Sequence, residues 1–258
     1  MRPGLRRRTL TASLRRAPVP ALLFMSTIGW AAMVWQTASH AARAADGGSG
    51  NALDVGHSHA MDAVGTVIDA HGLVIWLAMV VAMSPLLLIR EVSRLWHGSI
   101  RRRRLATVLL FAGAYALVWL LAGVIAVPLT DPIAGSAILT WLAVGLTALW
   151  LCSPPRQRYL NVCHTAPRLR VFGAAAQWEA ARHGLITGGA CVASCGVVMA
   201  LVLLATDYHL LAMISATIFL TIERYAPARR PRWRLPVIAS AAPEFTDLRG
   251  RGPVSAGR

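Results

Sequence analysis

The sequence predicts an all-α membrane protein, a bundle of about six transmembrane helices with its N-terminus and C-terminus in the cytoplasm. Of the 258 residues, 56% are hydrophobic and only 14% are charged, whereas a soluble domain carries about a quarter charged residues. The apolar residues form blocks of about 20, the length that crosses a bilayer core of about 30 Å. Arginine-bearing segments alternate with these blocks, which is the pattern that orients a chain across a membrane.

Six apolar runs are the expected spans. The first, residues 21–42, follows a basic cytoplasmic segment, residues 1–20, and we interpret it as a retained signal-anchor. A cleaved signal peptide is the alternative interpretation, because the small residues at 41–45 suit a cleavage site. The other five runs cover residues 72–89, 105–127, 133–151, 184–206 and 210–222.

The connections between the spans differ in length. Residues 43–70 contain a Gly-Gly-Ser-Gly stretch without apolar periodicity and are expected to form a flexible outer loop. Short turns at 128–135 and 207–209 predict two antiparallel hairpins within a five-span core, residues 71–227. Residues 228–258 are basic and rich in Pro and Gly, and we expect a disordered cytoplasmic tail.

The positions of the arginines predict the orientation. All 26 basic residues are Arg, and only Arg43 falls outside the four segments that this topology places in the cytoplasm. Positive loops remain on the cytoplasmic side, so we expect a multi-pass protein of the bacterial-type inner (plasma) membrane. Six acidic residues fall on the opposite side: Asp46, Asp54, Asp62, Asp69, Asp131 and Asp207.

Several function classes are disfavoured by the sequence. The net charge of +15 suggests nucleic acid in a soluble protein, but here the charges lie between spans, so we expect no nucleic-acid partner. The four cysteines lie in or beside spans, which argues against a disulfide framework. No hydrolase or ATPase motif is present, and no span centre carries Asp, Glu or Arg. We therefore expect no enzymatic activity.

The strongest candidate site is a pair of cysteines in the fifth span. Cys191 and Cys195 are four residues apart, and Met199 follows one turn later, so the three sulfurs share one face of a helix. Thiolates and thioethers suit a soft cation such as Cu(I). The alternative is packing, because Cys is small and this helix is rich in Gly and Ala, as closely packed membrane helices are.

Met79 and Met83 in the second span repeat the four-residue spacing. With a rise of about 1.5 Å per residue, this pair and the cysteine pair lie at matching depths. We therefore expect the second and fifth spans to be direct neighbours, with four sulfurs around one site. Methionine is also ordinary core filler, which is the competing interpretation.

Two further groups lie outside the spans. The outer loop carries His57, His59, Met61 and Asp62, with His71 at the mouth of the second span, a combination able to capture a metal ion. The inner loop carries Cys163 and His164, which lack the paired spacing of a zinc site.

Three motifs occur in order along the chain: Asn-Val-Cys-His at 161–164 and Cys-Val-Ala-Ser-Cys at 191–195 after Arg-His-Gly at 182–184 follow the Met-bearing second span at 76–85. In these motifs the chain resembles the Domain of Unknown Function 2182 family of predicted metal-binding integral membrane proteins. The resemblance covers about residues 65–227. This chain departs from the family pattern at Gly196, where the family has Trp, and at Ser84, where it has a second Met.

Together the motifs and the resemblance predict a membrane protein that binds copper or another soft transition metal for handling or delivery. Its partners would be the lipid bilayer and metal-carrying proteins. Cys191 and Cys195 would be the primary ligands, assisted by Met79, Met83 and Met199. The alternative is a non-metal scaffold or assembly subunit whose Cys and Met residues only pack.

Overall fold

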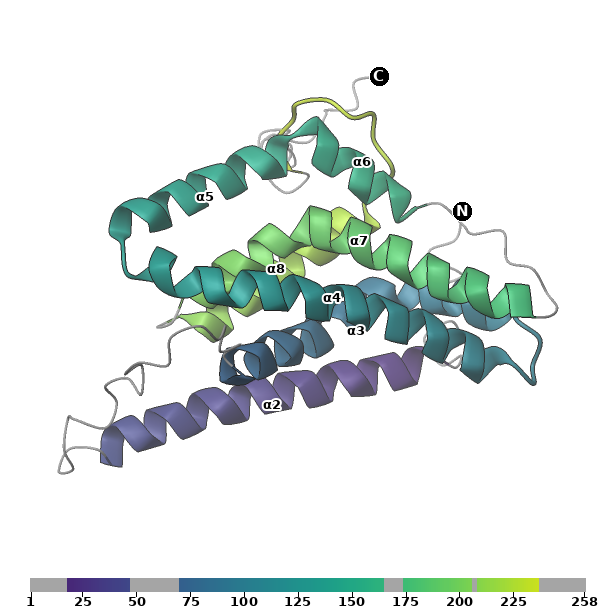
Figure 1. Cartoon of the computed structure of the whole chain (residues 1–258), viewed down its shortest axis with the longest axis horizontal. Helices are drawn as coiled ribbons and strands as arrows, with labels where there is room; N and C mark the ends of the chain where they lie inside the picture. The colour runs from purple at the N-terminus through teal and green to yellow at the C-terminus, as the bar shows by residue number, and fades with distance from the viewer. Residues whose placement is uncertain (1–17, 47–69, 165–173, 206–207, 237–258) are drawn as a thin grey trace, which may run out of the picture.

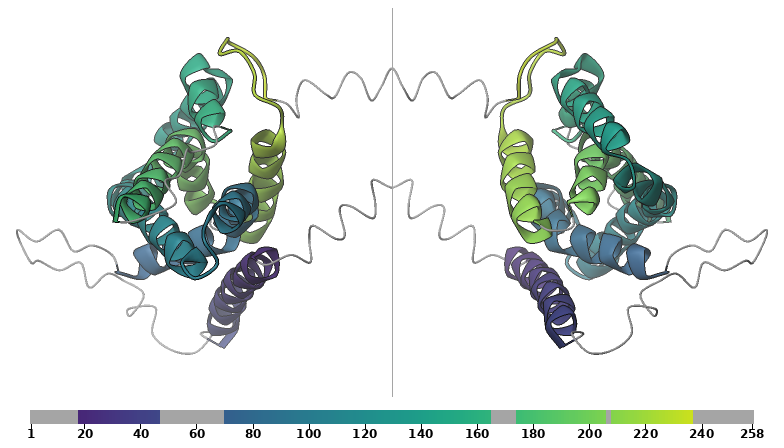
Figure 2. Two further views of the ribbon diagram at one scale, coloured as in Figure 1. Left: turned by 90° about the vertical axis from the view of Figure 1, so that its right-hand side faces the viewer. Right: turned by 90° about the vertical axis from the view of Figure 1, so that its left-hand side faces the viewer.

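The computed structural model describes residues 18–46, 70–164, 174–205 and 208–236. These residues form seven helices and no strand, so the all-α class is confirmed for the described part of the chain. In order, the helices are α2 (Val19–Asp46), α3 (Ala70–Gly98), α4 (Arg104–Ala134), α5 (Ala137–Cys152), α6 (Pro154–Val162), α7 (Ala174–Leu204) and α8 (His209–Tyr225). The α2 helix and the α5–α6 pair lie on opposite sides of the bundle, with the other four helices between them (Figure 1, Figure 2).

Four of these helices, α2, α3, α4 and α7, are long and apolar enough to cross a membrane. A fifth candidate span arises if α5 and α6, which meet at a bend of 62°, are counted as one. The α8 helix has 17 residues and is shorter than the other candidates. The described residues therefore give four to five candidate spans where we expected six.

The core of the bundle is the contact between α4 and α7, the most extensive helix pair in the described part of the chain. Gly184 makes this close approach possible. A Cβ atom added there would lie 2.9 Å from the Ala114 Cβ and closer still to the Phe111 carbonyl oxygen. Small residues let helix backbones approach in this way, so the glycine-rich sequence of α7 sets the distance between the two helices.

The α3 helix packs against α4 through an aromatic contact. Trp76 is buried, and its indole N–H donates a 2.9 Å hydrogen bond to the Trp119 carbonyl. The indole ring occupies the space where Gly123 has no side chain, since an added Cβ would lie 2.6 Å from the Trp76 Nε1. Trp76 therefore both fills the α3–α4 interface and has its polar atom satisfied.

The α2 helix packs on α3 at another glycine. A Cβ atom added to Gly29 would lie 2.6 Å from the Ala82 backbone nitrogen. The hydroxyl of Ser26 donates a 2.6 Å hydrogen bond to the Ala82 carbonyl. These contacts fix α2 beside the middle of α3, which contains Pro85.

The bend between α5 and α6 follows from local sequence. Ser153 ends α5 and caps α6 by accepting a hydrogen bond from the Arg156 backbone N–H. Pro154 then occupies the first position of α6, where its missing N–H costs nothing. The buried Arg156 side chain donates hydrogen bonds to the carbonyls of Leu151 and Ser194, so it ties the bend to α7.

Three helix boundaries differ from those that the hydropathy pattern predicted. The α4 helix continues through the expected turn to Ala134, with Pro128 and Pro132 inside it. The α7 helix begins at Ala174, ten residues before the predicted span. The α6 helix was not predicted at all, because it is polar and lies in the expected inner loop.

The described part of the expected C-terminal tail lies against α6. The Asn161 side chain donates a 2.7 Å hydrogen bond to the Arg229 carbonyl and accepts one from the Arg229 backbone N–H. The Arg234 backbone N–H donates to the carbonyl of Cys152 at 3.2 Å. The first residues after α8 thus return across the α5–α6 junction.

Candidate functional site

The cysteine pair of α7 lies in the protein core. Cys191 is 0% exposed and Cys195 is 4% exposed, and both belong to the main hydrophobic cluster. Their side chains interact directly with each other. Ser194 lies between them in the sequence, with its hydroxyl 3.3 Å from the Cys195 sulfur and bonded to the Cys191 carbonyl. The four-residue spacing therefore does bring two thiols together on one helix face.

The predicted methionines are buried in the same cluster. Met79, Met83 and Met199 have exposures of 0%, 1% and 2%. The cluster also contains Met33 from α2 and Met213 from α8, which sequence reasoning missed because neither belongs to a paired spacing. The hydrophobic cluster thus contains thioethers from four helices together with the two thiols.

Tyr115 of α4 connects the two predicted halves of the site. Its buried hydroxyl lies 3.3 Å from the Cys191 sulfur and 3.2 Å from the Ser84 hydroxyl of α3. The expectation that α3 and α7 pack directly on each other needs correction: in the described residues α3 packs mainly on α2 and α4, α7 packs mainly on α4, and α3 and α7 have little or no direct contact. The α4 helix carries no Cys or Met, so no motif in the sequence predicted a role for it in the site.

The inner-loop residues Cys163 and His164 lie at the end of α6, close to the same core. Cys163 is 5% exposed and interacts with the Arg224 side chain and, electrostatically, with Cys195 and Glu91. Burial raises the pKa of the Cys163 thiol to about 11, although Arg224 opposes the shift. Burial, together with Arg224 and Arg90, lowers the pKa of His164, so its imidazole is a neutral potential ligand near pH 7.

Two buried ion pairs, from adjacent residues of α8, lie beside these thiols. Arg224 pairs with Glu91 of α3 at 3.2 Å, and Glu223 pairs with Arg156 of α6 at 3.3 Å. All four side chains are nearly inaccessible to solvent. The sequence analysis missed both ion pairs because the paired residues are far apart in the chain. The one available indication was that Glu91 and Arg224 each lie just after an apolar run.

The predicted outer capture residues lie wholly or partly outside the described part of the structure. His57, His59, Met61 and Asp62 lie outside the described residues, and His71 lies in the first turn of α3. The described ranges also contain no group of three His, Cys, Asp or Glu side chains that could together hold a metal ion. The donors that are present fit a soft ion rather than a hard one, since they are two thiols with thioether neighbours.

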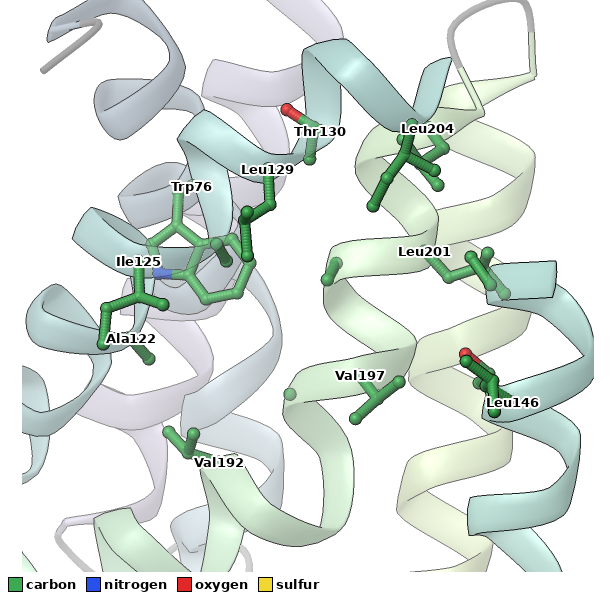
Figure 3. Close-up of a pocket in the computed structure, with 16 residues that line it drawn as sticks. Trp76, Ala122, Ile125, Leu129, Thr130, Leu146, Val192, Val197, Leu201 and Leu204 are labelled. Carbon is green, nitrogen blue, oxygen red and sulfur yellow. The ribbon is translucent and has the colours of Figure 1, made fainter. Parts of the chain in front are cut away.

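A separate cavity of about 460 Å³ lies between α4, α5 and α7 (Figure 3). Its walls are almost wholly apolar, with Trp76, Leu129, Leu146 and Leu201 among the lining side chains. Neither Cys191 nor Cys195 lines it, because it faces the other side of α7. The cavity is therefore distinct from the thiol site.

Comparison with known proteins agrees with the chemistry of this core. No curated protein and no solved structure matched the chain. A family model described as "PpoB2: Copper chaperone" matches residues 73–245, which include most of α3, all of α4 to α8 and both cysteines of the pair. With more than half of its length matched, this sulfur-lined chain belongs to the PpoB2 copper chaperone family.

Proposed function

We propose that the protein is a copper chaperone integral to the bacterial-type inner membrane, with six spans and both termini in the cytoplasm. The four to five candidate spans among the described helices support this topology, and α8 would be the remaining, shorter span. The distribution of arginine supports the orientation. The resemblance to the Domain of Unknown Function 2182 family agrees with a membrane protein that handles metal.

Copper is the cargo, and Cys191 and Cys195 are its primary ligands. The observation that carries this proposal is the buried thiol pair on one face of α7 within a methionine-lined core. Met79, Met83 and Met199 assist, because flexible thioethers can move toward an ion held by the thiols. Soft sulfur ligands select Cu(I) over harder divalent ions.

In the same proposal the ion enters from the outer side, and the protein catalyses no reaction. His57, His59, Met61, Asp62 and His71 collect the ion outside, and Cys163 with His164 stands at the inner end of the core. Metal-carrying proteins are the partners on either side. The protein binds and releases the ion, so neither an enzymatic activity nor a nucleic-acid partner is part of this function.

The decisive experiment is copper binding by purified protein. Titration with Cu(I) against a competing chelator should give one ion per chain for the wild type, and this binding should be lost in Cys191→Ser/Cys195→Ser. Cys152→Ser is the matched control, because Cys152 is a half-buried cysteine at the end of α5 and should leave binding unchanged. If the double variant is folded and binds as much copper as the wild type, the thiols only pack, and a scaffold role replaces the chaperone role.

A further inference from the structure

Arg224 is a buried cation with an unused hydrogen-bond donor. Its guanidinium is 5% exposed, and Nη2 donates to the Glu91 carboxylate at 3.2 Å. The second terminal nitrogen, Nη1, is buried and has no hydrogen-bond partner among the described residues. The facing Glu91 Oε2 is likewise buried and unpartnered in the described part of the chain. The pair is therefore joined by one hydrogen bond rather than two.

The guanidinium also lies among the thiols. Arg224 interacts electrostatically with Cys191 and Cys195, and its side chain contacts Cys163. Arg224 also interacts electrostatically with Tyr115, whose hydroxyl bonds to Cys191. Arg156 also acts on Cys195, but its guanidinium bonds to the Ser194 and Leu151 carbonyls and to Glu223. Arg224 is the cation that interacts with all three thiols, Cys163, Cys191 and Cys195.

Packing alone does not account for this arrangement. Burying an ion pair carries a desolvation cost that its attraction often fails to recover, and apolar replacements are frequently as stable. An Arg–carboxylate pair built for stability is commonly bidentate, whereas this one leaves a donor and an acceptor unsatisfied. Unsatisfied buried groups cost free energy, so the arrangement fits a state in which Nη1 acquires a partner.

Copper binding at the pair creates that partner. One Cu⁺ displaces the protons of two thiols, which pass to water, and the resulting copper–bisthiolate carries one negative charge. An uncompensated charge in an apolar core is strongly unfavourable. A nearby guanidinium offsets it and donates a charge-assisted hydrogen bond to a thiolate sulfur.

We propose that Arg224 is the positioning residue that compensates the negative charge of the copper-loaded Cys191–Cys195 pair, with Glu91 holding its guanidinium ready in the empty state. This inference rests on the proposed copper site. The inference gives α8 a role in copper binding, and it gives Arg224 and Glu91 opposite effects on that binding. Arg224 favours the loaded state, whereas Glu91 competes with the copper–bisthiolate for the same cation.

The test is Cu(I) affinity by chelator competition in four variants of the full-length protein. Arg224→Gln should weaken binding by about tenfold or more, as expected for loss of a unit charge near another in a protein interior. Arg224→Lys keeps the charge and should stay within about threefold of the wild type. Glu91→Gln removes the competing carboxylate, so affinity should be unchanged or higher. Arg158→Gln is the control, because Arg158 is an exposed arginine on α6 that has no part in the proposed site.

The double variant Glu91→Gln/Arg224→Gln controls for misfolding of the single variants, in which one buried charge has lost its partner. The double variant instead leaves two neutral amides that can bond to each other. We expect it to remain folded and to bind Cu(I) as weakly as Arg224→Gln. A purely structural ion pair predicts the reverse: both single variants lose binding alike, and the double variant recovers it. Wild-type affinity in a folded Arg224→Gln variant also overturns the inference, while loss of binding only in Cys191→Ser/Cys195→Ser leaves the proposed function intact.

Discussion

Gly184→Ala tests whether the α4–α7 contact positions the thiol site. The added methyl group would lie 2.9 Å from the Ala114 Cβ and nearer still to the Phe111 carbonyl oxygen. The oxygen belongs to the α4 backbone, which cannot rotate away as a side chain can. Overpacking of this kind costs about 1–3 kcal/mol, and the better helix propensity of Ala returns about 0.5–1 kcal/mol. We expect a net loss of about 1–2 kcal/mol in the free energy of unfolding.

The same helix supplies a matched control. A Cβ atom added to Gly189 meets nothing within 4 Å, so Gly189→Ala has the same propensity gain without the clash. It should be neutral or more stable by up to about 1 kcal/mol. Reversible unfolding of the purified variants in detergent measures the difference. If Gly184→Ala is as stable as Gly189→Ala, the close approach of α4 and α7 does not constrain the core as argued.

Three further predictions concern topology and the site. A reporter active only outside the cytoplasm should work when fused after Asp54 and fail after Arg170; activity at both positions would refute the proposed orientation. Tyr115→Phe removes the hydroxyl that bonds to Cys191 and Ser84 and should cost about 1 kcal/mol in unfolding free energy, unlike Tyr159→Phe at an exposed tyrosine. The raised pKa of Cys163 means that the folded protein favours the neutral thiol. The neutral thiol therefore contributes its full stabilisation below pH 9.0, the ordinary pKa of a cysteine, and this stabilisation is lost as the pH rises toward about 11. In Cys163→Ser the free energy of unfolding should therefore fall less between pH 9 and pH 11 than in the wild type. An equal fall in both proteins would contradict the raised pKa of Cys163.

Hydropathy predicted the helices better than their ends. The apolar runs located α2, α3, α4, α5, α7 and α8, because each must bury an apolar surface in lipid or in the bundle. A helix does not stop where its apolar run stops, however. The α7 helix begins ten residues earlier because Ala-rich sequence continues the helix without needing apolar surroundings. The α6 helix escaped prediction because its polar residues bond to other elements, as Arg156 does.

The site was predictable only where its residues are neighbours in the sequence. The Cys191–Cys195 spacing specifies a shared helix face whatever the surrounding fold. Tyr115 of α4 contacts Cys191, and Glu91 of α3 pairs with Arg224 of α8. Helix order alone does not specify which residues of these helices meet. The expected direct α3–α7 contact failed for the same reason, since equal depth in a membrane does not determine which helices touch.

The separation of the cavity from the thiol pair affects how the proposed copper site could work. A large apolar pocket with a few converging polar groups is the usual first choice for a binding site, but the cavity beside Val192 and Gly196 is lined by apolar groups and offers no soft ligand. The thiols lie on the other face of α7, in the methionine-containing hydrophobic cluster and near the buried Arg156 and Arg224. A site without an open cavity can bind an ion only if its side chains move, and thioethers are the most adaptable of core side chains. If copper binds here as proposed, a site of this kind would gain less from rigid coordination and would release its ion more readily, as delivery requires.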